Sequence, residues 1–263
     1  MDANPVLVER RDGYRVITLN RPQRLNAFNE PMQKAFVAAV TASEKDESCR
    51  ALLLTGTGRA FSSGQDLSER INAAGEIAIP GAALELYYNP LVRKIRALPF
   101  PVVCAVNGAA AGVSCNIALA CDIVLAARSA SFLQPFARLG IVPDGGGTWL
   151  LPRLIGQARA RGLALLAEPL SAEKAEQWGL IWKVVDDANL MAEAEQLCVH
   201  FSTAPTFGLG LIKRALDAAE DNNLSAQLDL ERNLQREAGA HPNYREGVQA
   251  FVQKRKPNFS GKR

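Results

Sequence analysis

Histidine is scarce in this 263-residue sequence, which contains only two. His200 lies in a helical pattern and His241 precedes a proline, and neither stands beside a serine or cysteine in a nucleophile motif. No histidine or cysteine spacing suits zinc. The phosphate-binding pattern G-x-x-x-x-G-K-S/T is absent, and the segment 56–64 lacks the G-x-G-x-x-G spacing of a dinucleotide site. These absences argue against a triad hydrolase, a zinc enzyme and a nucleotide-binding enzyme.

Strong net charge and paired cysteines are also missing. The formal net charge is only +3, which argues against a dedicated nucleic-acid binder. The cysteines form an odd, scattered set without a C-x-x-C pair, and this usage indicates reduced, mostly buried thiols in a cytoplasmic protein. The five are Cys49, Cys104, Cys115, Cys121 and Cys198. The first residues, MDANPVLVERRDG, lack the apolar segment of a signal peptide.

The longest apolar stretch, residues 101–127, does not fit a membrane span. It opens with a proline and contains Asn107, Asn116 and Asp122. Its front is rich in valine, as a buried strand would be. The stretch therefore predicts a buried strand, a glycine-containing turn, a buried helix and a second strand, and no membrane association.

Strand and helix patterns alternate through the first half of the chain. Short apolar strands such as ALLLTG and VVCAV alternate with amphipathic helices, which predicts an α/β fold with a largely parallel sheet. Beyond about residue 145 the pattern becomes almost entirely helical. We therefore expect a core over residues 1–200 and a C-terminal helical region over 201–263, which could pack on the core or on a neighbouring subunit.

Two glycine-containing turns follow buried strands, at residues 56–67 and 107–120. Their small residues would let backbone N–H groups face a cleft, and two N–H groups converging on one point would form an oxyanion hole. The alternative is that both are only tight loops of a packed α/β protein.

Asp144 stands alone between an apolar run and three glycines, in GIVPDGGGTW. It could cap a helix that begins at residues 145–147, because aspartate is a favoured N-cap residue. It could instead transfer protons in an apolar surround. These ten residues leave both hypotheses open.

Five motifs, taken together, resemble the crotonase (enoyl-CoA hydratase/isomerase) family from about residue 5 to 260. They are LNRPQRLNAF, GRAFSSGQDL, AVNGAAAGVSCNIALACDI, FARLGIVPDGGGTWLLPR and AEQWGLIWKVV. The resemblance implies a crotonase-type spiral of ββα units and a trimer or hexamer assembled through the C-terminal helices. It also implies acyl-CoA thioester substrates, with coenzyme A as part of the substrate, and neither a separate cofactor nor a metal.

The resemblance also assigns catalytic roles. The backbone N–H groups of Gln65 and Val113 would form the oxyanion hole. Asn116 and Phe136 occupy the positions of the two glutamates that hydratases of the family use, and neither can act as a general base. Asp144 falls where isomerases of the family place a catalytic aspartate. The resemblance therefore favours one-base proton transfer by Asp144, with Asn116 and Phe136 facing the substrate.

Further positions match family contacts to coenzyme A. Arg24 and Ala27 would border its nucleotide, and Asp66, Leu67 and Ser68 would continue along the same groove. Asp66 could equally fix its own loop.

In the C-terminal region, Phe251 and Lys254 match positions that reach the coenzyme A of a neighbouring subunit. The basic tail around them could also be a solvated face or a weak nucleic-acid patch.

Within the family, YYNPLVRKI, IVPDGGGTWLLPR and TFGLGLIKRAL are most similar to the branch that isomerises the ring 1,2-epoxide of phenylacetyl-CoA to the seven-membered oxepin-CoA. The alternatives are a Δ3,Δ2-enoyl-CoA isomerase, an enoyl-CoA hydratase of fatty-acid oxidation, and a non-catalytic member that binds coenzyme A or RNA.

Overall fold

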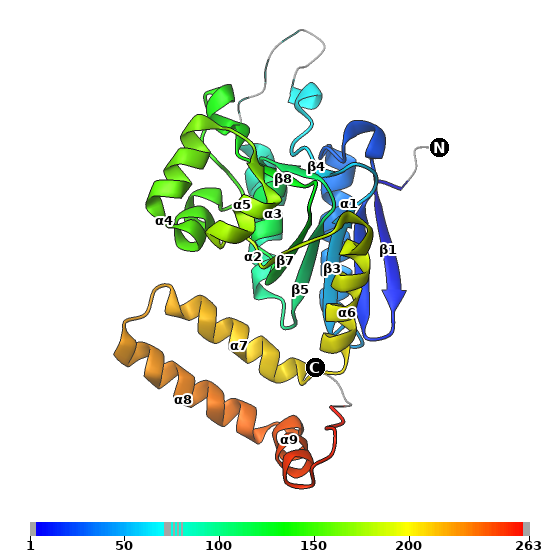
Figure 1. Ribbon diagram of the computed structural model, residues 1–263, viewed down its shortest axis with the longest axis vertical. Coiled ribbons are helices and arrows are strands. Elements are labelled where there is room, and N and C mark those ends of the chain that lie inside the picture. Colours follow the sequence, from blue (N-terminus) through cyan, green and yellow to red (C-terminus); the bar gives the residue numbers. More distant parts are fainter. Residues whose placement is uncertain (1–3, 71–74, 76, 78, 80, 260–263) are drawn as a thin grey trace.

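The computed structural model describes residues 4–70, 75, 77, 79 and 81–259. Its main sheet has six strands in the order β1-β2-β3-β5-β7-β10 (Figure 1). These are β1 (Val6–Arg11), β2 (Tyr14–Leu19), β3 (Ala51–Gly56), β5 (Val102–Val106), β7 (Ile123–Ala127) and β10 (Lys183–Val185). The β1–β2 hairpin is antiparallel, and the other neighbouring pairs are parallel. The predicted α/β class is confirmed.

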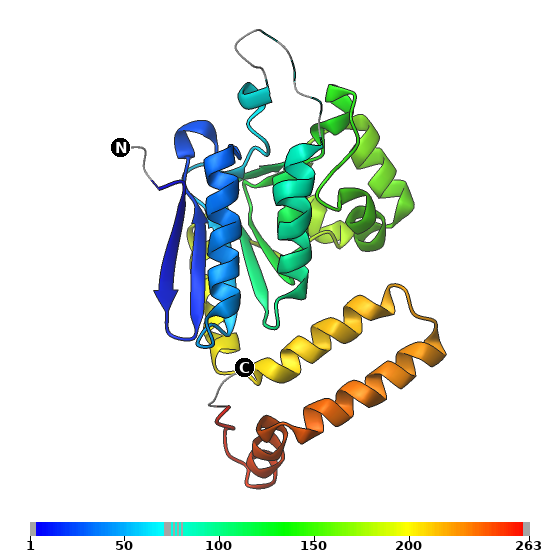
Figure 2. The ribbon, with the colours of Figure 1, turned by 180° about the vertical axis from the view of Figure 1, so that it is seen from behind.

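Helices cover both faces of this sheet, which is why its central strands are apolar along their length. All five residues of β5 are buried. Helices α1 (Glu30–Lys45) and α2 (Asn89–Ala97) lie on one face, and α6 (Leu190–Ser202) lies on the other (Figures 1 and 2). Helix α1 begins at Glu30, because the Asn29 side chain accepts a hydrogen bond from the Met32 N–H and so caps the helix.

A second, smaller sheet has the strand order β4-β6-β8-β9. Its strands are β4 (Ala60–Ser62), β6 (Ala109–Ala111), β8 (Ser131–Leu133) and β9 (Leu170–Ser171). Strands β4, β6 and β8 each follow a long strand of the main sheet, and α2, α3 (Val113–Leu119) and α4 (Gly147–Leu166) come next in the chain. This succession repeats a ββα unit along the chain.

The two sequence segments expected to be simple turns therefore each contain a strand, β4 or β6. The half of the chain expected to be almost entirely helical also contains the short strands β9 and β10. Two or three small residues carry no periodic signal, and pairing with distant strands makes them extended.

The last three helices lie apart from the sheets, at the bottom of Figure 1. They are α7 (Thr206–Ala219), α8 (Leu224–Ala240) and α9 (Pro242–Val252). The Lys213 ammonium of α7 pairs with Asp122 at 2.7 Å and thereby ties this layer to the core. The boundary that the sequence predicts at residue 200 lies inside the last turn of α6.

All five cysteines are free and buried, as predicted. Burial raises the pKa of the Cys115 and Cys198 thiols to about 12, so neither is a reactive thiolate near neutral pH. In the part of the chain that the structure describes, no helix is both long and apolar enough to cross a membrane.

Candidate active site

A cavity of about 1000 Å³ opens beside the second sheet. Its walls come from the loop after β4, the start of α3, the segment 135–146, and the turn that leads into α2. Most lining residues are apolar, among them Leu67, Phe136, Leu139 and Val142. Asp144 is the one charged residue among the described residues that line the cavity. The cavity therefore offers a carboxylate in an apolar surround, as expected from the sequence.

The segments that carry Gln65 and Val113 meet at this cavity. Gly64 has a φ of +87°, and a Cβ added there would lie 2.6 Å from the carbonyl oxygen of Ala111. Only glycine tolerates both the left-handed backbone and this close approach. The Ser114 hydroxyl joins the same two segments by donating to the Ser62 carbonyl at 2.7 Å. The structure thus brings both predicted donor segments to one cavity wall.

Backbone pairing orients Gln65. Phe28 donates its N–H to the Gly64 carbonyl at 2.7 Å and accepts the N–H of Asp66 at 3.0 Å. In such a parallel bridge, the residue between the two bonded ones turns its own N–H and C=O to the opposite side. The Gln65 backbone N–H therefore points away from Phe28.

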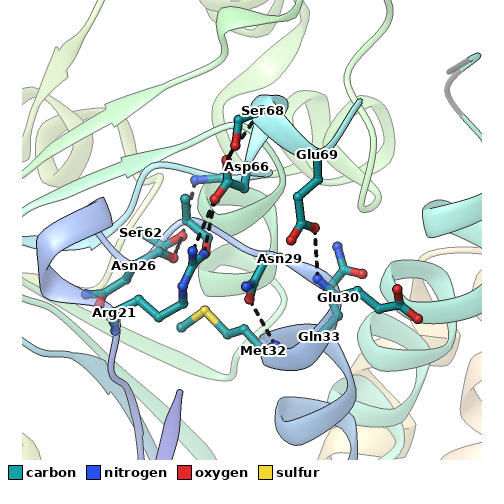
Figure 3. Close-up of polar contacts among 12 residues, drawn as sticks. Arg21, Asn26, Asn29, Glu30, Met32, Gln33, Ser62, Asp66, Ser68 and Glu69 are labelled. Carbon is teal, nitrogen blue, oxygen red and sulfur yellow. Dashed lines mark hydrogen bonds and ion pairs between the residues drawn. The ribbon is translucent and has the colours of Figure 1, made fainter. Parts of the chain in front are cut away.

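Polar contacts hold this loop from behind (Figure 3). The Ser62 hydroxyl donates to the Asn26 carbonyl at 2.7 Å, and the Arg21 guanidinium pairs with Asp66 at 3.2 Å. Asp66 also accepts the Ser68 hydroxyl at 2.6 Å. Burial alone would raise the pKa of Asp66, but the hydrogen bonds from Ser68 and Arg21 lower it below its usual value. Asp66 thus fixes its own loop, the second of the two roles that the sequence predicts for it.

Asp144 lies just before α4, but it is not the N-cap residue of that helix. Gly146 occupies the N-cap position, so the capping hypothesis is wrong in that form. Asp144 is instead anchored through its main chain: its carbonyl accepts the Gly147 N–H at 2.9 Å and the Asn116 side-chain amide at 2.7 Å. Its carboxylate oxygen Oδ1 is buried.

The three glycines after Asp144 meet two different structural demands. Gly145 and Gly146 have φ values of +55° and +84°, in the region that favours glycine. Gly147 has ordinary dihedral angles, but a Cβ added there would lie 2.5 Å from the Asn116 amide nitrogen. The run lets the chain turn sharply and then pack directly on Asn116.

Asn116 lies behind the Asp144 loop and does not line the cavity. It is fully buried, and its side-chain oxygen accepts the amide of the equally buried Gln134 at 2.7 Å. The predicted substrate contact of Asn116 is therefore replaced by a contact to the main chain of Asp144. Gln134 was not singled out from the sequence, where its only sign is an amide within the apolar run SFLQPF. Phe136, in contrast, lines the cavity.

Of the remaining predicted residues, Leu67 lines the cavity and the others do not. Arg24 is exposed and Ala27 is buried, and neither lines the cavity, whereas Leu67 does. Phe251 is 85% exposed near the end of α9, the helix at the bottom of Figure 1 on the far side of α7 and α8 from the second sheet, and Lys254 follows it in the chain. A contact from these two to coenzyme A would therefore require another subunit. The residues placed by the structure hold no cluster of three or more His, Cys, Asp or Glu that could bind a metal ion.

The sequence and the fold both resemble those of known proteins. The model of the family Enoyl-CoA hydratase/isomerase matches residues 9–262. A 1,2-epoxyphenylacetyl-CoA isomerase of Escherichia coli (strain K12) is 55% identical over 95% of this chain and 96% of that protein. A probable enoyl-CoA hydratase of Rhodobacter capsulatus is 45% identical over the full length of both. The crystal structure of an enoyl-CoA hydratase from Bacillus anthracis superposes with a TM-score of 0.89 at 30% identity, covering 98% of this chain and 99% of that one. The chain therefore belongs to the enoyl-CoA hydratase/isomerase family and has the crotonase fold.

Proposed function

We propose that this protein is an acyl-CoA isomerase that converts ring 1,2-epoxyphenylacetyl-CoA to oxepin-CoA in phenylacetate catabolism. The observation that carries the proposal is Asp144, the one carboxylate among the described residues that line an apolar cavity, which the Gln65 and Val113 segments also line. The 55% identity to a 1,2-epoxyphenylacetyl-CoA isomerase supports the choice of substrate.

In this mechanism the backbone N–H groups of Gln65 and Val113 bind the thioester oxygen and stabilise the enolate. Asp144 takes a proton from the carbon next to the thioester. The carbon–carbon bond shared by the six-membered ring and the epoxide then breaks, the oxygen stays in the enlarged ring, and the proton returns to a ring carbon. The product contains the same atoms and electrons as the substrate, so the reaction needs no second substrate. An apolar cavity also protects the epoxide from opening by water.

Two observations disfavour hydration as the main activity. Hydration needs one group to deprotonate water and another to protonate carbon. The Asn116 amide is hydrogen-bonded to the Asp144 carbonyl and to Gln134. Phe136 places an apolar ring in the cavity wall, at a position where hydratases of the family have a glutamate. A Δ3,Δ2-enoyl-CoA isomerase acting on aliphatic chains is the second candidate, because it would use the same aspartate and the same two N–H groups.

Assembly into a homotrimer or hexamer is part of the proposal. Helices α7 and α8 carry four apolar side chains that are more than half exposed, Ile212, Leu216, Leu224 and Leu228. Such exposed apolar side chains favour an interface with another subunit. A subunit interface over these helices would bury them and could carry Phe251 and Lys254 to a neighbouring cavity. Coenzyme A enters as part of the substrate, and the cytoplasmic location stays a prediction.

The test compares three substrates on the purified protein: enzymatically made epoxyphenylacetyl-CoA, 3-hexenoyl-CoA and crotonyl-CoA. We expect epoxide turnover, and crotonyl-CoA hydration at least about 10³-fold slower than isomerisation, because general acid–base groups for water are lacking. Hydration within tenfold of isomerisation would contradict the assignment. Asp144→Asn should lower turnover by about 10²–10⁴-fold without loss of coenzyme A affinity.

The control variant is Asp144→Ser, which removes the base but keeps a side chain that can accept backbone N–H bonds. A purely structural role for Asp144 would appear as a parallel loss of stability and activity in both variants, or as less than a threefold fall in turnover. Filter binding with RNA tests the non-catalytic alternative, and we expect no retention of RNA.

A further inference from the structure

Asn89 is a polar residue of the cavity wall to which the mechanism above assigns no role. Besides Asp144, the described lining contains three polar side chains: Ser63, Gln65 and Asn89. The first two belong to the loop after β4. Asn89 belongs to a different wall, at the first residue of α2.

Local structure does not explain an asparagine at this position. The backbone of Asn89 is helical, with φ −64° and ψ −45°, and asparagine is a weak helix former. Its side chain makes no hydrogen bond to any other residue that the structure describes. The π-helical turn Leu84–Tyr88 directly precedes it, and such turns frequently occur at functional sites.

The helix face that carries Asn89 lies against the Asp144 loop. Val92 is three residues further along α2 and therefore on the same face. A Cβ added at Gly146 would lie 3.9 Å from the Cγ1 atom of Val92. This contact places the first turn of α2 beside the loop that carries the acid, so Asn89 borders the part of the cavity where the acyl group reacts.

Its surroundings give the Asn89 amide a specific use. Leu84, Leu139 and Val142 line the cavity with it and offer no hydrogen-bond acceptor in their side chains. An amide N–H donates to ether, hydroxyl or carbonyl oxygen. A plain aliphatic acyl chain carries no such oxygen beyond its thioester, whereas a ring epoxide does.

We propose that Asn89 is a specificity residue that donates a hydrogen bond to an oxygen atom carried by the acyl part of the substrate. For the reaction proposed above, on which this inference rests, that atom is the epoxide oxygen that becomes the ring oxygen of the product. A site built to bond such an oxygen discriminates against analogues that lack it, since they leave the donor unsatisfied.

The experiment measures kcat/KM for epoxyphenylacetyl-CoA and for 3-hexenoyl-CoA with the wild type and three variants. Asn89→Leu keeps the approximate shape of the side chain and removes the donor, so it should lower kcat/KM for the epoxide about 10-fold, the scale of one hydrogen bond. Its kcat/KM for 3-hexenoyl-CoA should stay within about twofold. Asn89→Ser keeps a donor and should recover part of the loss on the epoxide. Leu84→Ala alters the same cavity wall without removing or adding a polar group, so it should change kcat/KM for both substrates by a similar factor.

Equal losses on both substrates in Asn89→Leu would overturn the inference and make Asn89 a shape-determining residue only. If the wild type turns over the epoxide and Asn89→Leu does so equally well, the inference fails and the proposed function stands. If the wild type turns over 3-hexenoyl-CoA but not the epoxide, the proposed function fails and this inference fails with it.

Discussion

Replacing Gly147 by alanine tests whether the buried contact behind Asp144 sets the position of the acid. The added Cβ would lie 2.5 Å from the Asn116 amide nitrogen and 2.9 Å from its Cγ and Oδ1 atoms. Asn116 cannot simply turn aside, because it is fully buried and bonded to Gln134 at 2.7 Å and to the Asp144 carbonyl at 2.7 Å. The clash must therefore shift the Asp144 loop or break a buried hydrogen bond.

The free-energy cost of each outcome can be approximated. Overpacking a buried site by one methyl group costs about 1–3 kcal/mol, and a lost buried hydrogen bond costs about 1 kcal/mol. The variant should thus lose about 1–3 kcal/mol of unfolding free energy. A displacement of the acid by about 1 Å would lower kcat up to about 100-fold, whereas coenzyme A contacts elsewhere would keep KM near its original value.

Urea unfolding gives the stability, and isomerisation of 3-hexenoyl-CoA gives kcat. The matched control is Gly162→Ala in the same helix, where no atom lies within 4 Å of the added Cβ and helix propensity predicts a gain of about 0.5–1 kcal/mol. A Gly147→Ala variant with unchanged stability and kcat within twofold of the wild type would refute the reasoning.

Two other predictions concern parts of the molecule outside the cavity. Hydrogen bonds from Ser48 and Arg15 lower the pKa of Asp46 from 3.8 to about 2, so the stabilisation is fully present above pH 3.8 and is lost as the pH falls through about 2. Asp46→Asn should therefore lower the free energy of unfolding by about 1 kcal/mol at neutral pH, after allowance for solvent screening, and by less at about pH 3. Urea unfolding measures the difference between wild type and variant, and a difference that is the same at both pH values would contradict this prediction. Light scattering should report three or six chains, and Lys254→Ala should raise KM for CoA esters more than it lowers kcat. A monomer at micromolar concentration, or a fall in kcat alone, would count against the assembly.

The sequence predicts the long elements of the fold well. Strand β5 is five buried apolar residues, and α1 has apolar residues at helical spacing behind an asparagine cap. The local sequence pattern missed the strands of the second sheet, because β6 is three alanines in a glycine-containing segment, which local preference cannot distinguish from a turn. Its extended form depends on pairing with β4 and β8, which are distant in the chain.

The sequence likewise predicts some residues of the candidate site and misses others. Motif resemblance placed Gln65, Val113 and Asp144 on one cavity, because their order along the chain is shared with the family. It could not show that Asn116 supports the Asp144 loop from behind, since that depends on the direction of one buried side chain. Gln134 was missed for a related reason: its bond to Asn116 spans 18 residues and follows no local pattern.

The position of two site residues on the single helix α3 limits how the reaction can change on this fold. Its first residue, Val113, supplies one of the proposed N–H donors, and Asn116, three residues later, holds the carbonyl of Asp144. One turn of helix, about 4.5 Å along the axis, thus separates the N–H group proposed to bind the thioester from the side-chain amide that holds the Asp144 loop. A displacement of α3 would carry both together and preserve their spacing. Moving the site of proton transfer along the acyl chain would then require changes in the glycine run at 145–147, with α3 left as it is.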